Sequence, residues 1–297
     1  PRTYRYERGD TRRLSLLFRQ RPKLEHAPLQ PMTPIEIEAR DGLTLVSYLT
    51  LPPGSDANTD GRPDQPAPMV IVVPDGPWTR ASYGFDAAHQ WLANRGYAVL
   101  SVNFRGSSGF GKAFLNAGNR EWGGKIQDDL SDAVQWAVQN GVAEPDHIAI
   151  MGQGFGGYAV LNALSMTPGL YRCGISYGGP ANLSALLSNY SSGIDRNQLY
   201  QRVGDPRTAD GRELLYDQSP IYRANQIRSP LLLAMGGRDP IASRSEADQI
   251  TLALRARGTS ATYLVFPDDG AELTRTQNRL AYLAVLEHFL GDCLGGR

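Results

Sequence analysis

The residues most able to do chemistry in this sequence lie in a glycine-rich stretch, residues 151–158, which follows a short apolar run, residues 147–151. A G-x-S-x-G pattern between a strand and a helix forms a sharp turn that lifts a serine hydroxyl above a sheet, where it can attack an acyl group. In this chain the centre of the pattern is Gly154. The small residues that the turn requires are therefore present, and the nucleophilic hydroxyl is absent.

A second stretch, residues 174–178, fits the same pattern by its letters and has Ser176 at its centre. It leads into Gly179 and Pro180 rather than into a helix. Because the pattern is informative only in a strand–turn–helix context, we interpret Ser176 as an ordinary residue at the end of a strand.

A serine nucleophile also needs a base within hydrogen-bonding distance. We expect the histidines of this chain in the N-terminal segment, in a helix, at the start of a strand and in the last helix. None is expected at the carboxyl end of a strand, where a parallel sheet gathers its functional residues, so a relocated catalytic base is not predicted. The 4 histidines are His26, His89, His147 and His288.

Short apolar runs alternate with helical patterns and must position the glycine-rich turn. Helices are predicted over residues 130–138 and 278–290, and a third opens with Ser243 and Glu246 as a capping box. Strands that alternate with helices predict an α/β fold with a mostly parallel sheet and helices on both faces. The apolar runs are 69–73, 98–102, 147–151, 173–177, 230–235 and 262–266.

Before these runs, alternating residues 35–38 and 43–45 flank Asp41-Gly42, a pattern typical of a β-hairpin. Residues 1–33 are polar and rich in arginine, and we interpret them as a linker or edge segment.

Composition excludes several classes of protein. The chain has 30 Lys and Arg against 30 Asp and Glu, a formal net charge of +0, so it lacks the basic excess of a nucleic-acid binder. No run approaches the roughly 18 apolar residues of a membrane span. The 2 cysteines, Cys173 and Cys293, cannot form a disulfide framework or a four-cysteine zinc site, and their wide separation favours the cytoplasm over secretion.

Beyond the turn, long stretches resemble the prolyl-oligopeptidase-like (S9) serine peptidases, particularly the acylaminoacyl-peptidase and dipeptidyl-peptidase branch. The resemblance runs from about Met32 to the C-terminus, and motifs of this length are more specific than the turn alone. The stretches that carry it are 90–100 (QWLANRGYAVL), 103–111 (NFRGSSGFG), 116–130, 237–240 (GRDP) and 294–297 (LGGR).

The resemblance implies an α/β-hydrolase domain over residues 34–297, with a small insertion at about 179–225. In the family a β-propeller usually precedes this domain, so residues 1–33 would be the linker or edge segment on its propeller side.

Residue by residue, the resemblance puts the nucleophile at Gly154, where the family has serine, and the base at Ala271, where it has histidine. The triad acid is Asp239, which matches. The oxyanion-loop motif His-Gly-Gly-Pro begins here at Pro74 and reads Pro-Asp-Gly-Pro, and the second oxyanion donor would be the backbone N–H of Phe155. Of the side chains that acyl transfer needs, the acid alone is present.

Aromatic and acidic side chains near these positions could line a pocket, although they fit core packing equally well. The space left by Gly154 and Ala271 could then hold a small molecule or a peptide. The pocket candidates are Trp78, Tyr83, Phe104, Phe110, Tyr158 and Glu272.

An acidic loop resembles the start of a calcium-binding loop, because oxygen-bearing side chains alternate along it. Its twelfth position is Ala67 rather than glutamate, and Pro63 interrupts it. We therefore interpret it as a solvated connection and expect neither a metal ion nor a cofactor. The oxygen-bearing residues are Asp56, Asn58, Asp60 and Asp64.

Three functions remain open. The first is a catalytically impaired family member, a pseudoenzyme, with a binding or scaffold role. The second is an enzyme that reuses the pocket for lyase or cyclase chemistry, and the third is an engineered inactive peptidase. Fold alone does not choose among them. The expected partners are a ligand in the cleft and either a second copy of the chain or a β-propeller domain, with no nucleic acid and no membrane.

Overall fold

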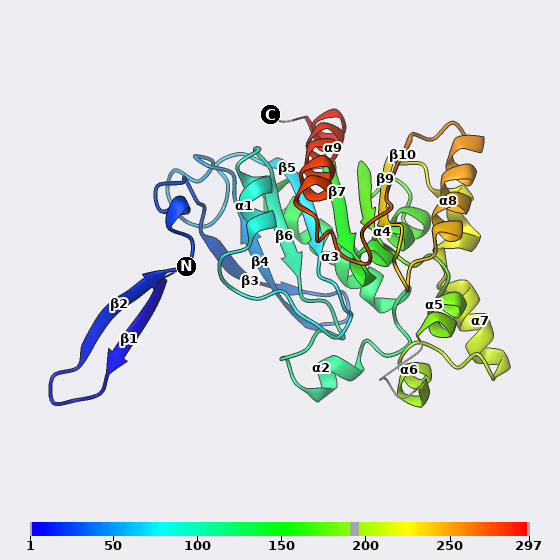
Figure 1. The fold of residues 1–297 in the computed structure, drawn as a ribbon, viewed down its shortest axis with the longest axis horizontal. Helices are drawn as coiled ribbons and strands as arrows, with labels where there is room; N and C mark the ends of the chain where they lie inside the picture. The colour runs from blue at the N-terminus through cyan, green and yellow to red at the C-terminus, as the bar shows by residue number, and fades with distance from the viewer. Residues whose placement is uncertain (1, 191–195, 296–297) are drawn as a thin grey trace.

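The computed structural model describes residues 2–190 and 196–295. Its centre is an eight-stranded sheet in the order β10-β9-β8-β7-β5-β6-β4-β3 (Figure 1). The strands from β10 to β6 pair in parallel, and β4 and β3 add to one edge in antiparallel pairs. The predicted fold class is confirmed. The strands are β3 (Met32–Glu38), β4 (Thr44–Thr50), β5 (Ala67–Val73), β6 (Ala98–Val102), β7 (Ala143–Gln153), β8 (Cys173–Tyr177), β9 (Leu231–Gly236) and β10 (Ala261–Phe266).

The apolar runs of the sequence form the central strands. β6 and β8 coincide with the predicted runs, and every residue in both is buried, as expected of parallel strands covered on both faces. β7 begins earlier than its run, because Ala143 already pairs with Ala67 of β5. The predicted hairpin before the polar loop is the β3–β4 pair.

Helices cover both faces of the sheet. α1 (Ala87–Ala93) and α9 (Thr276–Leu294) pack on one face, and α3 (Lys125–Gln139), α4 (Phe155–Met166) and α8 (Arg244–Ala256) pack on the other. All the predicted helices lie within these elements. The remaining helices are α2 (Lys112–Asn116), α5 (Leu183–Asn189), α6 (Arg196–Arg202), α7 (Ala209–Asp217) and the 3-10 turns η1 (Pro22–Leu24) and η2 (Pro220–Gln226).

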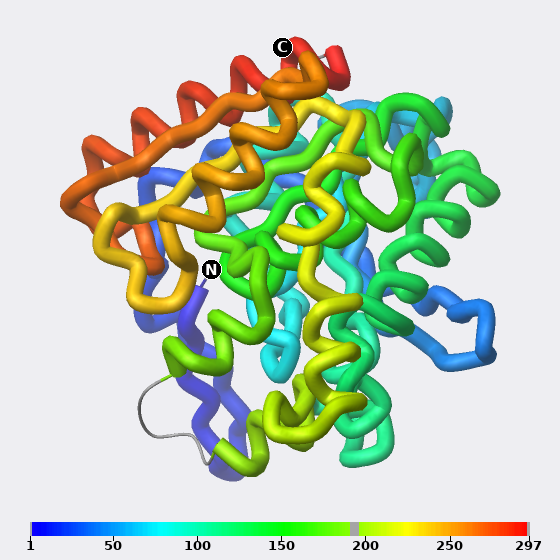
Figure 2. Tube along the Cα trace, turned by 90° about the vertical axis from the view of Figure 1, so that its right-hand side faces the viewer, coloured from blue at the N-terminus to red at the C-terminus, as the bar shows by residue number. Residues whose placement is uncertain are grey.

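The predicted insertion, residues 179–225, contains α5, α6 and α7; residues 191–195 within it, and the last two residues of the C-terminal motif 294–297, lie outside the described residues. Figure 2 shows the insertion helices at the opposite end of the molecule from α9.

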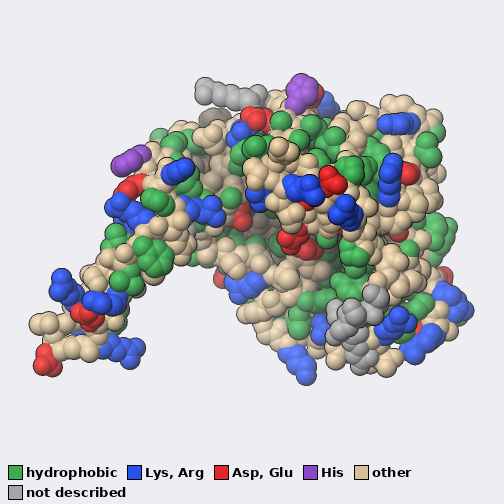
Figure 3. All heavy atoms as spheres, viewed as in Figure 1, with side chains coloured by type: hydrophobic (Ala, Val, Ile, Leu, Met, Phe, Trp, Pro, Cys, Tyr) green, Lys and Arg blue, Asp and Glu red, His purple; other side chains and the backbone are tan. Residues whose placement is uncertain are grey.

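The N-terminal segment contains a hairpin, β1 (Arg2–Glu7) and β2 (Arg13–Arg19), that pairs with no strand of the central sheet. It extends away from the body, with basic and hydrophobic side chains side by side (Figures 1 and 3). The expected linker or edge segment thus has regular structure that the sequence analysis did not predict, and its place beside a propeller stays a prediction. Its exposed apolar residues are Tyr4, Tyr6, Leu14, Leu16, Leu17 and Phe18.

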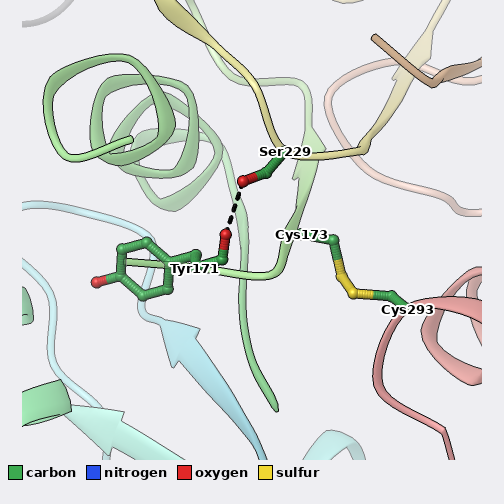
Figure 4. Close-up of a disulfide and its surroundings, with 4 residues drawn as sticks. All are labelled: Tyr171, Cys173, Ser229 and Cys293. Carbon is green, nitrogen blue, oxygen red and sulfur yellow. Dashed lines mark hydrogen bonds between the residues drawn. A yellow bond between two sulfur atoms is a disulfide. The ribbon is translucent and has the colours of Figure 1, made fainter. Parts of the chain in front are cut away.

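A disulfide joins Cys173, the first residue of β8, to Cys293 near the end of α9, across 120 residues of sequence (Figure 4). Their Cα atoms lie 6.4 Å apart because α9 packs over this end of the sheet. The two cysteines therefore pair although they lie far apart in the sequence. Because disulfides persist in oxidising compartments, the cysteines no longer favour the cytoplasm.

Ser229, in the loop before β9, donates a hydrogen bond of 2.7 Å from its hydroxyl to the carbonyl oxygen of Tyr171 beside the disulfide (Figure 4). This contact holds the start of β8 against the chain that enters β9.

We predict that the double variant Cys173→Ser/Cys293→Ser loses about 2–4 kcal/mol of unfolding free energy, because its unfolded chain is no longer cross-linked. Urea unfolding of oxidised protein measures the difference. A reductant should lower the wild-type midpoint and leave that of the variant unchanged. A wild-type midpoint that ignores the reductant would contradict the prediction.

A buried ion pair ties the loop after β6 to α3. The guanidinium of Arg105 donates to Asp129 at 2.6 Å and to Asp41, in the β3–β4 turn, at 2.7 Å. Arg105 and Asp129 are both buried. Hydrogen bonds from Arg105 lower the pKa of Asp41 to about 2, so this carboxylate is ionised at neutral pH.

We predict that Asp129→Ala destabilises the protein by about 3–5 kcal/mol, because it leaves the buried Arg105 guanidinium short of a partner. The matched control is Asp128→Ala, which removes a neighbouring carboxylate on α3 that pairs with the exposed side chain of Arg40. That exposed pair should contribute less than about 1 kcal/mol. Similar urea midpoints for the two variants would show that burial of the Arg105 pair is unimportant.

Candidate active-site cleft

The predicted glycine-rich turn has the backbone of a nucleophile elbow. β7 ends at Gln153 and α4 begins at Phe155, with Gly154 between them at φ 56° and ψ −119°. This left-handed conformation favours glycine. A Cβ atom on Gly156 would lie 2.5 Å from the carbonyl oxygen of Val73, so α4 can approach β5 only without a side chain at that position.

A cavity of about 230 Å³ opens above this turn. Loops that follow five different strands contribute to it, at the carboxyl edge of the sheet where the sequence predicted the site. Its lining includes Asp75 after β5, Gly154 after β7, Gly178 after β8, Asp239 after β9 and Ala271 after β10.

The three positions that the resemblance assigns to a catalytic triad thus meet in one cavity. The carboxylate of Asp239 accepts backbone N–H groups from Ile241 and Ala242 at 2.8 and 3.0 Å. Ala271 presents a methyl group, and its carbonyl oxygen accepts a hydrogen bond of 3.0 Å from Gln153. Among the described residues, no serine, cysteine or histidine lines the cavity.

The loop that carries Ala271 is fixed by Asp269. This carboxylate accepts hydrogen bonds from the hydroxyl of Thr274 at 2.8 Å and from the side-chain amide of Asn278 at 2.7 Å. The bonds from Asn278 and Thr274 lower the pKa of Asp269. The arrangement joins the loop after β10 to the start of α9.

Asp75, which the sequence analysis did not select, occupies the oxyanion side of the cleft. Its Oδ1 atom accepts the backbone N–H of Phe155 at 2.8 Å and that of Gly76 at 2.8 Å. Pro74, the selected residue of this loop, does not line the cavity. The sequence did carry a sign of this role, because Asp75 stands where the family's His-Gly-Gly-Pro motif has its first glycine.

The pocket candidates lie in three places: at the cavity, in the core behind it, and outside both. Trp78 and Glu272 line the cavity, as does Phe155. Phe104 and Tyr158 are buried core residues behind Phe155, with ring centroids 5.4 and 5.6 Å from it.

Two further candidates lie outside the cavity. Tyr83 is exposed and packs near Tyr48, and Phe110 packs against Phe114 beneath the guanidinium of Arg80. Of the possible lining residues, Tyr83, Phe104, Phe110 and Tyr158 do not line this cavity, and the alternative of core packing fits Phe104 and Tyr158. Apolar residue type does not distinguish a side chain that faces a cavity from one that faces the core.

The insertion supplies one wall of the cleft, with Leu186 and Tyr190 at α5 and Leu199 on α6. Glu246 fixes this wall, because its buried carboxylate accepts the N–H groups of Ala181 and Asn182 at 2.8 and 2.9 Å. Burial raises the pKa of Glu246.

The predicted capping box of α8 is therefore only half present. Ser243 caps the helix by accepting the N–H of Ser245, whereas Glu246 contacts the insertion instead of returning to the helix start. A tertiary contact has replaced the local one.

The remaining serine and histidine candidates are not catalytic in this geometry. Ser176 is buried and donates its hydroxyl to the carbonyl oxygen of Gly157 at 3.0 Å. His89 is buried between the hydroxyls of Thr50 and Ser101. The other histidines do not line the cavity: His26, His147 and His288.

The side-chain oxygen atoms of the acidic loop accept hydrogen bonds from N–H groups of the same loop. Asp56 accepts the N–H groups of Asp60 and Gly61, and Asp64 accepts that of Ala57. Within residues 2–190 and 196–295, no cluster of three or more His, Cys, Asp or Glu side chains could hold a metal ion.

Across the same ranges, no helix has the length and apolar character that crossing a bilayer requires.

We predict that Asp269→Asn lowers the urea midpoint at neutral pH, because its amide group cannot accept all the bonds that the carboxylate accepts. The folded-state pKa of Asp269 lies below its ordinary value. Its contribution to stability is therefore present above the unfolded-state pKa and is lost as the pH falls through the folded-state pKa. The wild-type and variant midpoints should converge in acid. The control is Asp268→Asn, an exposed neighbour, and equal losses in both variants would refute the role of Asp269.

Comparison with known proteins agrees with this geometry. The model of the prolyl oligopeptidase family matches residues 83–297. The chain is 53% identical to dipeptidyl aminopeptidase BIII of Pseudoxanthomonas mexicana, over 99% of this chain and 43% of that protein. It is 38% identical to dipeptidyl peptidase family member 6 of Caenorhabditis elegans, over 99% of this chain and 42% of that protein. The chain thus spans less than half the length of these relatives.

Among solved structures, a puromycin-hydrolyzing peptidase of Mycobacterium tuberculosis superposes with a TM-score of 0.86 at 26% identity, over 95% of this chain and 43% of that one. An acylaminoacyl peptidase of Pyrococcus horikoshii shares the fold, with a TM-score of 0.81 at 21% identity, over 95% and 45% of the two chains. Taken together, the mostly parallel sheet, the elbow-like turn and the family match over residues 83–297 show that the chain belongs to the prolyl oligopeptidase family.

Proposed function

We propose that this chain is a catalytically impaired member of the prolyl oligopeptidase family that binds a small molecule or a peptide in its cleft. The observation that carries the proposal is Gly154, which stands at the centre of the elbow with no side chain while the cavity above it stays open.

The chemistry of acyl transfer supports the proposal. A hydroxyl must attack the acyl carbon while a base takes its proton. The positions for these groups carry Gly154 and Ala271, and Asp239 alone has no imidazole to orient. Loss of the nucleophile and base together costs on the order of 10⁶ in kcat in a serine hydrolase.

The lining of the cleft supports binding. Trp78, Phe155 and Tyr190 provide aromatic surface, and Asp75 and Glu272 provide carboxylates. A concave site with apolar walls and a few polar groups is typical of ligand pockets. Because the relatives are more than twice as long as this chain, a β-propeller or other partner domain that restricts access is part of the proposal.

We predict no turnover of p-nitrophenyl esters or aminoacyl-anilides above the uncatalysed rate, because no serine or histidine of the described residues lines the cavity. Spectrophotometric release of nitrophenol or nitroaniline measures this. The proposal would be wrong if the wild-type protein hydrolysed these substrates and Asp239→Asn abolished the activity.

Binding is measured on the same protein by thermal shift with a panel of di- and tripeptides. Ligands of the cleft should lose their shift in Trp78→Ala, which removes an aromatic wall. They should retain it in Tyr83→Ala, which removes an exposed aromatic outside the cavity. Shifts that survive Trp78→Ala would place the bound peptide elsewhere.

A further inference from the structure

We infer that the Asp75 carboxylate fills the oxyanion position of this cleft, so that restoring a serine and a histidine is not enough to restore hydrolysis. The inference rests on the proposed function and identifies a second obstacle to the reaction besides the missing serine and histidine. The resemblance to the family gives Asp75 no role, and the inference gives it one, which is to occupy the oxyanion position.

The hydrogen bonds of Asp75 place it there. An oxyanion hole consists of donors that lie 2.7–3.1 Å from the oxygen that becomes negative. In this fold one donor is the N–H of the residue that follows the nucleophile position, which is Phe155. That N–H already donates to Oδ1 of Asp75 at 2.8 Å, and Gly76 donates to the same atom at 2.8 Å.

The nucleophile position is blocked by the same side chain. A Cβ atom built on Gly154 would overlap Oδ1 of Asp75 and would lie 2.9 Å from its Cγ atom and 3.0 Å from Oδ2. A serine at position 154 therefore requires the carboxylate to move. Gly154 and Asp75 are mutually dependent, since the absence of a side chain at one position makes room for the other.

Electrostatics favours the carboxylate in this place. Phe155 is the first residue of α4, a helix of 12 residues, and the N-terminus of a helix stabilises negative charge. A hydrogen bond to a charged acceptor is also stronger than one to the neutral carbonyl oxygen of a substrate. A substrate carbonyl would thus have to displace the Asp75 carboxylate from the Phe155 N–H and then develop its own charge beside it.

The charge of Asp75 also affects the pKa of Tyr190, which lines the same cavity. Burial raises the pKa of the Tyr190 hydroxyl, and the negative charge of Asp75 adds to this effect. Both residues line the cavity, so the charge of Asp75 acts on the cleft itself.

The test compares three revertants: Gly154→Ser/Ala271→His, the same pair with Asp75→Gly, and the same pair with Asp75→Asn. Asp75→Gly empties the oxyanion position, whereas Asp75→Asn keeps an oxygen that can accept the Phe155 N–H. We expect the Asp75→Gly revertant to hydrolyse p-nitrophenyl esters at least about 10²-fold faster than the double revertant, the usual effect of an oxyanion-hole donor. The Asp75→Asn revertant should remain close to the double revertant.

Labelling by a fluorophosphonate provides a second measure. The introduced serine oxygen bonds to phosphorus, fluoride leaves, and the histidine takes the hydroxyl proton. The mass increase of the protein then counts labelled sites, and it should appear faster with Asp75→Gly than with Asp75→Asn. Equal rates in all three revertants would overturn the inference and leave the proposed function standing. Turnover by the wild-type protein would instead overturn the proposed function.

If no revertant reacts, the inference is tested on the chain that keeps Gly154 and Ala271 and carries a substitution at Asp75 alone. The chain contains 8 phenylalanines, so selective ¹⁵N labelling of phenylalanine gives a spectrum in which the Phe155 amide can be assigned. Loss of a charge-assisted hydrogen bond should move its proton resonance upfield in Asp75→Gly, and by less in Asp75→Asn. A Phe155 resonance that is unchanged in Asp75→Gly would overturn the inference.

Discussion

Close backbone contact between β5, β7 and α4 is the constraint on which the rest of this structure depends. A Cβ atom on Gly152 would lie 2.5 Å from the carbonyl carbon of Gly156, and one on Gly156 would lie equally close to the carbonyl oxygen of Val73. These approaches fix the turn at Gly154, together with a hydrogen bond of 3.0 Å from the Gly154 N–H to the carbonyl oxygen of Tyr177. Because packing requires these glycines, the shape of the turn does not depend on a side chain at position 154.

The absence of a side chain at Gly154 leaves room for a carboxylate in the cleft. Once position 154 has no side chain, the loop after β5 can turn the Asp75 carboxylate onto the N-terminus of α4. Asp239 and Glu272 line the same cavity. A serine hydrolase stabilises developing negative charge at this place, whereas three carboxylates among the described residues line this cleft. The family's architecture thus supports a different electrostatic environment without any change in the order of its strands.

Much of the fold could be predicted from the sequence because its information is local. The runs at β6 and β8 are buried on both faces, so apolar residues mark them from end to end. The pairing of Cys173 with Cys293 could not be predicted, because it depends on where α9 packs. At the site, the position of Gly154 came from the glycine-rich turn, and those of Asp239 and Ala271 came from the resemblance to the family. Asp75 was missed because its place in the cleft follows from loop geometry. Tyr158 lies in the core, because core and cavity positions on α4 share one residue type.

The disulfide also changes what backbone cleavage can do to this molecule. Cys173 and Cys293 enclose the insertion, β9, β10 and most of α9 in one covalent ring. A protease that cuts once anywhere inside this ring produces two polypeptides that cannot separate. The walls of the cleft that lie within the ring, including Leu199, Asp239 and Ala271, remain tethered to the elbow at Gly154. Under oxidising conditions a nicked molecule would migrate as a single species and would divide into fragments only on reduction.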